Sequence, residues 1–408
     1  MEYNTIIIGG GAAGLFCAAS LQTECGKVLL LERGERLGKK LSSTGNGQGN
    51  VTNLSVGKTD YFSFSKTGNQ RVQSLLSRYG RQRLVSFLEG LGGLFCADDR
   101  GRVYPTGRQA SAITDLLRFE VERKGVEVRL SAFVKCVKRQ DEGYLVVADT
   151  PEGERRFFAR NVVLCTGGKA AKNFGTDGNG YALARAFSHT VTRLYPALVQ
   201  LKTDTKHIKT LKGIRCNGAV VTASVDGREV GRAKGDVIFT DYGVSGDAVF
   251  RISSFVTAVA ESGTASLFID LLPEISYEKL YAVLEEKRKN FPTLAESELL
   301  CGILNNQVGR AVMKRCGGKS LAEVAACVKA FSLTVTGTLG FDYAQVTKGG
   351  VCFDEVTDGM ESVYASGLYL IGEIVDVDGE CGGYNLQWAY TSACACAEQI
   401  NGKGRWQV

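Results

Sequence analysis

Short apolar runs and segments of helical periodicity alternate at the start of the chain. The run from Asn4 to Ile8 is short and β-branched, which is typical of a buried parallel strand. Residues 12–22 place small side chains, Leu and Phe at helical spacing, and Lys27 to Leu31 is a second apolar run that ends at Glu32. The pattern therefore predicts a strand, a helix and a second strand within the first 32 residues.

The next part of the chain continues this alternation. Its pattern predicts an amphipathic helix at 109–123, strands at 126–130 and 133–138, and a hairpin that joins 144–150 to 155–159. The apolar run from Val162 to Cys165 then predicts a buried strand that ends in Thr-Gly-Gly. We expect this strand to lie beside the first one and to bring its glycines to a bound cofactor, although an ordinary turn would look the same in the sequence.

The pattern changes near residue 195. Short β-type runs at 199–203, 219–225 and 237–240 predict a small β-rich domain, to which 333–338 returns. Between them, helical periodicity covers 248–261, 276–289, 304–316 and 320–330. The apolar run Leu368 to Ile371 then returns to the first domain, and a helix follows at 386–400.

Composition limits the partners that the chain can have. It has 408 residues, of which 44% are hydrophobic and 23% charged, as in soluble globular proteins of two or three domains. The net charge of +6 is spread thinly along the chain, so we expect no nucleic-acid partner. No apolar run approaches the roughly 20 residues that a membrane span needs.

The cysteine and histidine residues indicate the compartment and argue against a metal site. Thirteen cysteines are an odd number, their positions are scattered, and the sequence begins directly with a strand instead of a signal peptide, which favours a reducing cytoplasm. The two histidines and the absence of CxxC pairs make a zinc site improbable. We expect a cytoplasmic protein without a metal.

A GxGxxG motif joins the first predicted strand to the first helix. In this context, Gly9 allows a tight turn, Gly11 lets a pyrophosphate approach the backbone, and Gly14 permits close packing of helix on strand. The helix N-terminus attracts the phosphates, and Glu32, eighteen residues after Gly14, can bind ribose hydroxyls. These residues predict a dinucleotide site.

A second glycine-rich stretch, TGNGQGNVTN at 44–53, has no such established meaning. Each glycine costs about 0.5–1 kcal/mol of chain entropy, so several together indicate unusual dihedrals or a close approach to a ligand, unless the stretch is a flexible surface loop. We interpret it as backbone that wraps a planar ring.

These motifs, together with FTDYGVSG at 239–246 and GEIVDVDGECGGYNLQWA at 372–389, resemble those of the BaiN/YhiN flavoproteins over nearly the whole chain. Members of that family include aminoacetone oxidases and an enzyme that reduces double bonds in 3-oxo bile acids. The resemblance implies an α/β fold with a Rossmann-like, two-dinucleotide-fold FAD domain, a β-barrel-like insertion, and a helical insertion nested within it. The corresponding domains would be 1–194 plus 345–408, 195–246 plus 331–344, and 247–330.

The resemblance also implies which residues contact the FAD. At the N-terminal end these are Gly9, Gly11, Ala13, Gly14, Glu32, Arg33, Lys40, Gly45, Asn46, Gly47, Asn50 and Thr52. Further along the chain they are Val134, Thr166, Gly167, Gly168, Gly372, Glu373, Asp376, Gly383, Tyr384, Asn385 and Leu386. We expect Glu373 to hydrogen-bond near the ribityl chain, and the N-H groups before the last helix to face the flavin pyrimidine.

The chain departs from the family pattern GGGRCNxTN in the second glycine stretch. Asn46 replaces a glycine, Gln48 an arginine and Gly49 a cysteine. Because asparagine tolerates positive φ, Asn46 can preserve the turn. The missing arginine leaves the substrate and the catalytic competence open.

Asp241 stands where the related pattern has a histidine. A carboxyl group there would need burial to raise its pKa before it could donate a proton near neutral pH. Tyr242 is the alternative donor, or a packing residue. Asp241 and Tyr242 are therefore our catalytic candidates.

We expect hydride transfer through flavin N5, with NAD(P)H as the electron donor. Because the two insertions provide enough surface for a large pocket, we favour reduction of a C=C bond conjugated to a ketone in an apolar, steroid-like acceptor. Two alternatives stay open: oxidation of a small amine with release of hydrogen peroxide, and a flavin-containing module that binds RNA or protein without turnover. No second GxGxxG is present, since the glycines at 175–180 have the wrong spacing.

Overall fold

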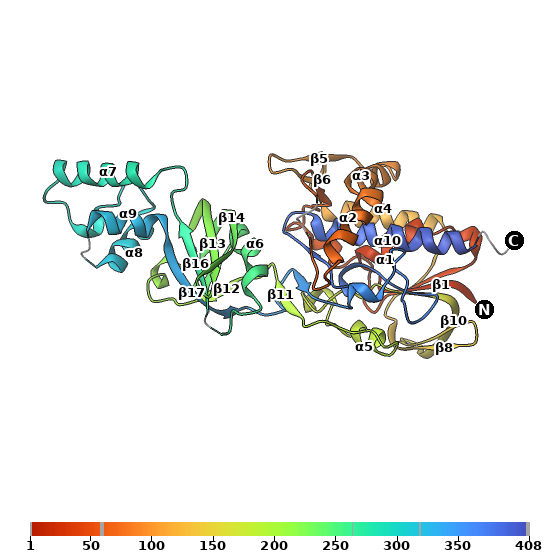
Figure 1. Cartoon of the computed structure of the whole chain (residues 1–408). Coiled ribbons are helices and arrows are strands. Elements are labelled where there is room, and N and C mark those ends of the chain that lie inside the picture. The colour runs from red at the N-terminus through yellow and green to blue at the C-terminus, as the bar shows by residue number, and fades with distance from the viewer. Residues whose placement is uncertain (1, 58–60, 263, 318–319, 405–408) are drawn as a thin grey trace. The chain divides into compact units, whose positions relative to one another are not determined.

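A computed structural model describes residues 2–57, 61–262, 264–317 and 320–404. The chain forms two compact units (Figure 1), the first made of residues 1–194 and 346–408 and the second of residues 195–345. The first unit therefore takes its chain from both ends of the sequence. Within the described residues, no helix combines the length and the apolar character needed to cross a membrane.

The first unit contains the sheet and the helices that the N-terminal pattern predicts. Its strands are β1 Tyr3–Ile8, β2 Val28–Leu31, β3 Thr52–Asn53, β4 Tyr61–Phe62, β5 Phe95–Ala97, β6 Arg102–Pro105, β7 Glu127–Arg129, β8 Phe133–Gln140, β9 Gly143–Thr150, β10 Gly153–Leu164, β18 Val346–Lys348, β19 Leu368–Leu370 and β20 Asp378–Gly379. Its helices are α1 Ala12–Ser20, α2 Gly68–Tyr79, α3 Arg81–Gly90, α4 Ala110–Arg123, α5 Gly180–Arg185 and α10 Tyr384–Gly404.

The main sheet has the order β7-β2-β1-β10-β9-β8, and β19 also pairs with β10. The β1 strand is parallel to both β2 and β10, with Ile7 opposite Val163, so the expected neighbour of the first strand is confirmed. The expectation of two separate strands at 155–159 and 162–165 is wrong. One strand, β10, pairs antiparallel with β9 in its first half and parallel with β1 and β19 in its second half.

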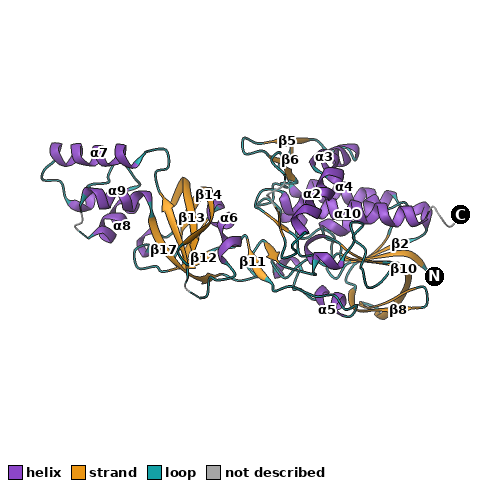
Figure 2. Ribbon diagram, in the orientation of Figure 1, coloured by secondary structure: helices purple, strands orange, loops and turns teal. Residues whose placement is uncertain are grey.

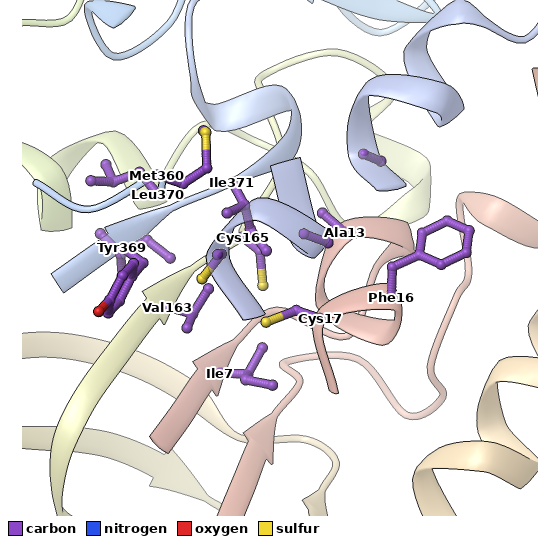
Figure 3. Packing of buried hydrophobic residues seen from close by; sticks show 14 of the residues in the cluster. Ile7, Ala13, Phe16, Cys17, Val163, Cys165, Met360, Tyr369, Leu370 and Ile371 are labelled. Carbon is purple, nitrogen blue, oxygen red and sulfur yellow. The ribbon is translucent and has the colours of Figure 1, made fainter. Parts of the chain in front are cut away.

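The core of this unit lies between the sheet and the helices α1 and α10. Figure 3 shows Ile7, Val163 and Tyr369 from three adjacent strands in one cluster with Cys17 of α1. Helix α10 packs along α1 (Figure 1), and its side chains Trp388 and Tyr390 are both 1% exposed. The C-terminal helix thus completes the core that begins at the N-terminal turn.

The second unit is built around a closed barrel of strand order β12-β15-β14-β13-β16-β17 (Figure 2). Its strands are β11 Tyr195–Ala197, β12 Leu201–Thr203, β13 Arg215–Val225, β14 Arg228–Phe239, β15 Gly243–Ser245, β16 Ala265–Asp270 and β17 Phe331–Thr338. Its helices are α6 Asp247–Val256, α7 Tyr277–Asn290, α8 Asn306–Cys316 and α9 Leu321–Lys329. The sequence did not predict β16, which lies between two helices and pairs with β13 and β17.

Candidate functional site

The glycine turn after β1 has the tight geometry that its spacing predicts. Gly9 has a φ of +113°, and a Cβ atom there would lie 2.5 Å from the carbonyl oxygen of Cys165 at the end of β10. A Cβ atom on Gly14 would lie 1.9 Å from the Gly9 oxygen, whereas one on Gly11 would meet no described atom within 4 Å. The turn is therefore closed against the protein at Gly9 and Gly14 and open at Gly11.

The carboxylate of Glu32 closes the other side of this turn. It accepts N-H hydrogen bonds from Gly10 and Gly34, both 2.6 Å long. Each carboxylate oxygen keeps acceptor capacity for a further donor. Arg33, the next residue, forms an ion pair with Asp177 at 3.0 Å, so the glycine stretch at 175–180 lies beside this edge of the turn.

The end of β10 meets two segments that are distant in the sequence. A Cβ atom on Gly168 would lie 2.4 Å from Thr347 Oγ1 and 2.8 Å from Glu373 Oε1. Glu373 also accepts the Thr347 N-H at 2.9 Å and pairs with Lys40 at 2.7 Å. The hydroxyl of Thr166, just before, is buried and has no hydrogen-bond partner among the described residues.

The glycine-rich loop at 44–53 uses left-handed backbone repeatedly. The φ angles are +61° at Gly45, +56° at Asn46, +81° at Gly47 and +79° at Gly49. The prediction that Asn46 preserves the turn in place of glycine is therefore confirmed. Asn50 is 4% exposed, and its side-chain oxygen has no partner among the described residues.

The structure explains why this chain has glycine where the family pattern has cysteine. A Cβ atom on Gly49 would lie 2.8 Å from Cα of Ala110, in addition to the strain of its positive φ. We expect Gly49→Cys to lower the free energy of unfolding by about 1–3 kcal/mol, measured by denaturant titration. Gln48→Arg is the matched control, because Gln48 is exposed and the change should leave stability within about 0.5 kcal/mol. Equal stability of both variants would contradict the argument.

The glycine-rich loop contacts the beginning of α10. A Cβ atom on Gly383, which has a φ of +101°, would lie 2.6 Å from the backbone of Thr52. The Thr52 hydroxyl donates to Gln387 at 2.7 Å. The side chain of Asn385 binds the backbone of Gly379 through both of its polar atoms, so it anchors the preceding loop.

A buried charged cluster lies just before α10. Asp376 is 0%, Asp378 4% and Lys348 7% exposed. Burial raises the pKa of each aspartate to about 7, while the attraction of Lys348 acts in the opposite direction. Burial also lowers the pKa of Lys348, against the attraction of the two carboxylates.

The raised pKa of Asp378 predicts how the stability of the folded protein changes with pH. In the unfolded chain this group loses its proton near pH 4, but in the folded protein it does so near pH 7, so its contribution to stability is present at low pH and is lost as the pH rises toward 7. Asp378→Asn should therefore raise the melting temperature relative to wild type more at pH 8 than at pH 5, at equal cofactor loading. Asp99→Asn, at an exposed position, should show no such difference. A larger gain at pH 5 than at pH 8 would refute this.

The two catalytic candidates lie in the second unit. The side chain of Asp241 is 60% exposed and pairs with Lys212 at 2.6 Å. That hydrogen bond lowers the pKa of Asp241, whereas a proton donor needs a raised one. A catalytic role for Tyr242 stays a prediction.

All of the expected cofactor residues lie in the first unit. Ala13, Val134, Tyr384 and Leu386 are buried, and a Cβ atom on Gly372 would lie 2.7 Å from that of Ala13. The sequence did not single out Thr347, Lys348 or Asp378. The sequence DVDG at 376–379, in which Asp376 and Asp378 alternate after a buried strand, is the pattern that could have indicated Asp378.

Comparison with known proteins identifies the family. The profile described as HI0933-like protein Rossmann domain matches residues 3–399. This chain belongs to the HI0933-like family. It is 35% identical to the 3-dehydro-bile acid delta(4,6)-reductase of Clostridium scindens over 405 residues, which covers 95% of this chain and 96% of that protein.

Other members of the HI0933-like family carry a different name. This chain is 31% identical to a ribosomal RNA dihydrouridine synthase of Haemophilus influenzae, over 97% of this chain and 98% of that protein. It is 30% identical to the Escherichia coli protein of the same name, over 98% of each chain. The small net charge therefore does not suffice to exclude a nucleic-acid partner.

Among solved structures, the fold resembles a 3-ketosteroid-delta4-(5alpha)-dehydrogenase from Rhodococcus jostii, with a TM-score of 0.53, 18% identity and 97% of each chain covered. A 3-ketosteroid delta1-dehydrogenase from Sterolibacterium denitrificans gives a TM-score of 0.52 at 13% identity, over 98% of this chain and 99% of that one. The Rossmann-like fold expected from the sequence is thus confirmed.

Proposed function

We propose that this chain is an FAD-dependent reductase of a C=C bond conjugated to a carbonyl group. The observation that carries the proposal is the relationship to the bile-acid reductase, at 35% identity over nearly the full length of both chains. The expected acceptor is accordingly apolar and steroid-like.

The residues of the first unit fit FAD. The turn is open at Gly11, where the pyrophosphate would approach the N-terminus of α1. Glu32 has acceptor capacity for ribose hydroxyls, and the buried oxygens of Asn50 and Thr166 have no partner among the described residues. Buried polar atoms normally have a hydrogen-bond partner, so these two support a bound polar group.

When bound, FAD would supply the hydride, and NAD(P)H is the electron donor that we propose for it. The protein itself would hold the cofactor in place and stabilise the charge on its reduced ring. Lys40, paired with Glu373, would hold the middle of the cofactor. The N-terminus of α10, which follows the contact between Gly383 and Thr52, would stabilise negative charge on the reduced ring.

A second candidate substrate is uridine within RNA. The two dihydrouridine synthases support it, because they match this chain over almost its full length. The chemistry is of the same kind, since the C5=C6 bond of uracil is conjugated to a carbonyl. In the steroid and in the nucleobase, the accepting C=C–C=O group is planar.

An anaerobic titration of the purified protein tests the proposal. NADH or NADPH should bleach the flavin spectrum, and a 3-oxo-Δ4,6 bile acid should restore it without peroxide. Restoration by unmodified ribosomal RNA, but not by the bile acid, would support the second candidate. Peroxide release with aminoacetone, or a purified protein without FAD, would refute the reductase.

A further inference from the structure

Basic residues are concentrated in one stretch of the first unit, residues 66–108. This stretch contains eight lysine and arginine residues and three acidic ones, whereas the whole chain contains 49 and 43. It forms α2, α3 and the antiparallel pair of β5 and β6. A local excess of basic side chains is typical of a surface that binds a polyanion.

Three of these arginines line a single groove. Arg78 near the end of α2 and Arg81 and Arg83 at the start of α3 border a groove of about 540 Å³. None of the described residues that line this groove is acidic. Its other lining residues are Leu54, Val56, Leu76, Ser77, Gly80, Gln82 and Ser86.

Two of the three guanidinium groups have no acidic partner. Arg81 donates a hydrogen bond to the carbonyl oxygen of Leu54 at 2.6 Å, and the guanidinium group of Arg83 lies 4.8 Å from the centre of the Tyr79 ring. Among the described residues, no carboxylate forms an ion pair with either arginine. Since a guanidinium group has five N-H donors, both keep donors for an anion.

The third arginine has an acidic partner at the surface. Arg78 forms an ion pair with Glu398 at 3.4 Å, and both side chains are more than half exposed. Exposed pairs of this kind contribute about 0–1 kcal/mol, because water and salt screen them. A phosphate group can therefore replace Glu398 as the partner of Arg78 at little cost.

The groove adjoins the loop that we expect to wrap the flavin. Leu54 lines the groove, and the side chain of the preceding residue, Asn53, donates to the carbonyl oxygen of Gly382 at 3.2 Å. Thr52 lies against Gly383, where an added Cβ atom would be 2.6 Å from the Thr52 backbone. Three consecutive residues thus connect the groove to the segment before α10, so a polymer in the groove would lie beside the candidate site.

We propose that this groove binds the phosphate backbone of an RNA substrate through Arg78, Arg81 and Arg83. This inference rests on the second candidate substrate of the proposed function, uridine within RNA. Guanidinium groups form bidentate hydrogen bonds with phosphate oxygens, and such contacts position a nucleic acid without reading its bases. The groove supplies affinity and register, and the site beside it selects the base.

Equilibrium binding of unmodified ribosomal RNA at several salt concentrations tests the inference. Wild-type affinity should fall steeply as the salt concentration rises, because each contact with a phosphate of a single strand adds about 0.7 to the slope of log K against log salt. The double variant Arg78→Gln/Arg83→Gln should lower this slope by about 1.4 and the affinity in about 0.1 M salt by about 25-fold. Both side chains are exposed, so FAD content and melting temperature should stay at their wild-type values.

Two further double variants separate a specific groove from a general effect of charge. Arg155→Gln/Arg156→Gln removes the same charge from exposed positions of β10 outside the groove, and RNA affinity should stay within about twofold of wild type. Arg78→Lys/Arg83→Lys keeps both charges and should keep the wild-type salt slope. Equal losses of affinity in the two Gln variants, or wild-type binding that does not depend on salt, would overturn the inference.

Reoxidation of the reduced flavin by the same RNA separates this inference from the proposed function. If RNA reoxidises the flavin and Arg78→Gln/Arg83→Gln binds RNA as tightly as wild type, the inference fails while the second candidate substrate stands. If RNA binds through the groove but does not reoxidise the flavin, the second candidate substrate fails while the groove stands as an RNA-binding surface. If the protein binds no RNA and reduces only the bile acid, the inference and the second candidate both fail and the bile-acid reductase stands.

Discussion

Gly14→Ala should yield a protein that unfolds at markedly lower denaturant concentration and is purified without FAD. The added Cβ atom would lie 1.9 Å from the carbonyl oxygen of Gly9 and 2.9 Å from the sulfur of Cys165. The first of these is a backbone atom between β1 and α1 and cannot rotate away, so the helix must separate from the sheet. Overpacking of this kind costs about 3 kcal/mol, a large fraction of the stability of a domain.

Gly11→Ala is the matched control for this change. Gly11 precedes α1 with a φ of −77°, which alanine adopts freely, and a methyl group there would meet no described atom within 4 Å. The variant should therefore keep the stability of the FAD-free protein and lose only affinity for the pyrophosphate. Denaturant titration in the absence of FAD, combined with an FAD binding titration, separates the two variants. If Gly11→Ala destabilised the protein as much as Gly14→Ala, the conclusion that the turn is open at Gly11 would be wrong.

Glu32→Lys should reduce FAD affinity by 100-fold or more. The change removes a carboxylate that accepts the Gly10 and Gly34 N-H groups at 2.6 Å, and places an ammonium group where two donors already converge. Hydrogen bonds to charged groups contribute about 1.5–3 kcal/mol each, and 2.7 kcal/mol corresponds to a factor of about 100. Purified Glu32→Lys protein should be colourless, and FAD titration should show the weakened binding.

Glu32→Gln is the control for the charge. Its amide oxygen can still accept one of the two N-H groups, so the turn should keep its shape and FAD affinity should fall by about 10-fold. A yellow Glu32→Lys protein with wild-type affinity would show that this carboxylate does not hold the ribose.

The N-terminal nucleotide unit was predictable from local sequence. The apolar run 4–8, the glycines at 9, 11 and 14, and the acid at 32 have meanings that depend only on neighbouring residues, because a turn, a helix start and a buried strand are short-range features. The positive φ of Asn46 also followed from residue type. By contrast, the single strand β10 was divided into two in the prediction, because its exchange of partners midway is not encoded in its own pattern.

What the sequence determined by itself is the type of each local element, together with the dinucleotide turn and the family. Only the tertiary structure decided which distant residues meet. It pairs Lys40 with Glu373, closes Gly383 against Thr52, and buries Asp378 with Lys348. The physical reason is that desolvation and charge pairing depend on distances in space, so a carboxyl group such as Asp378 shows its raised pKa only once the chain has folded around it.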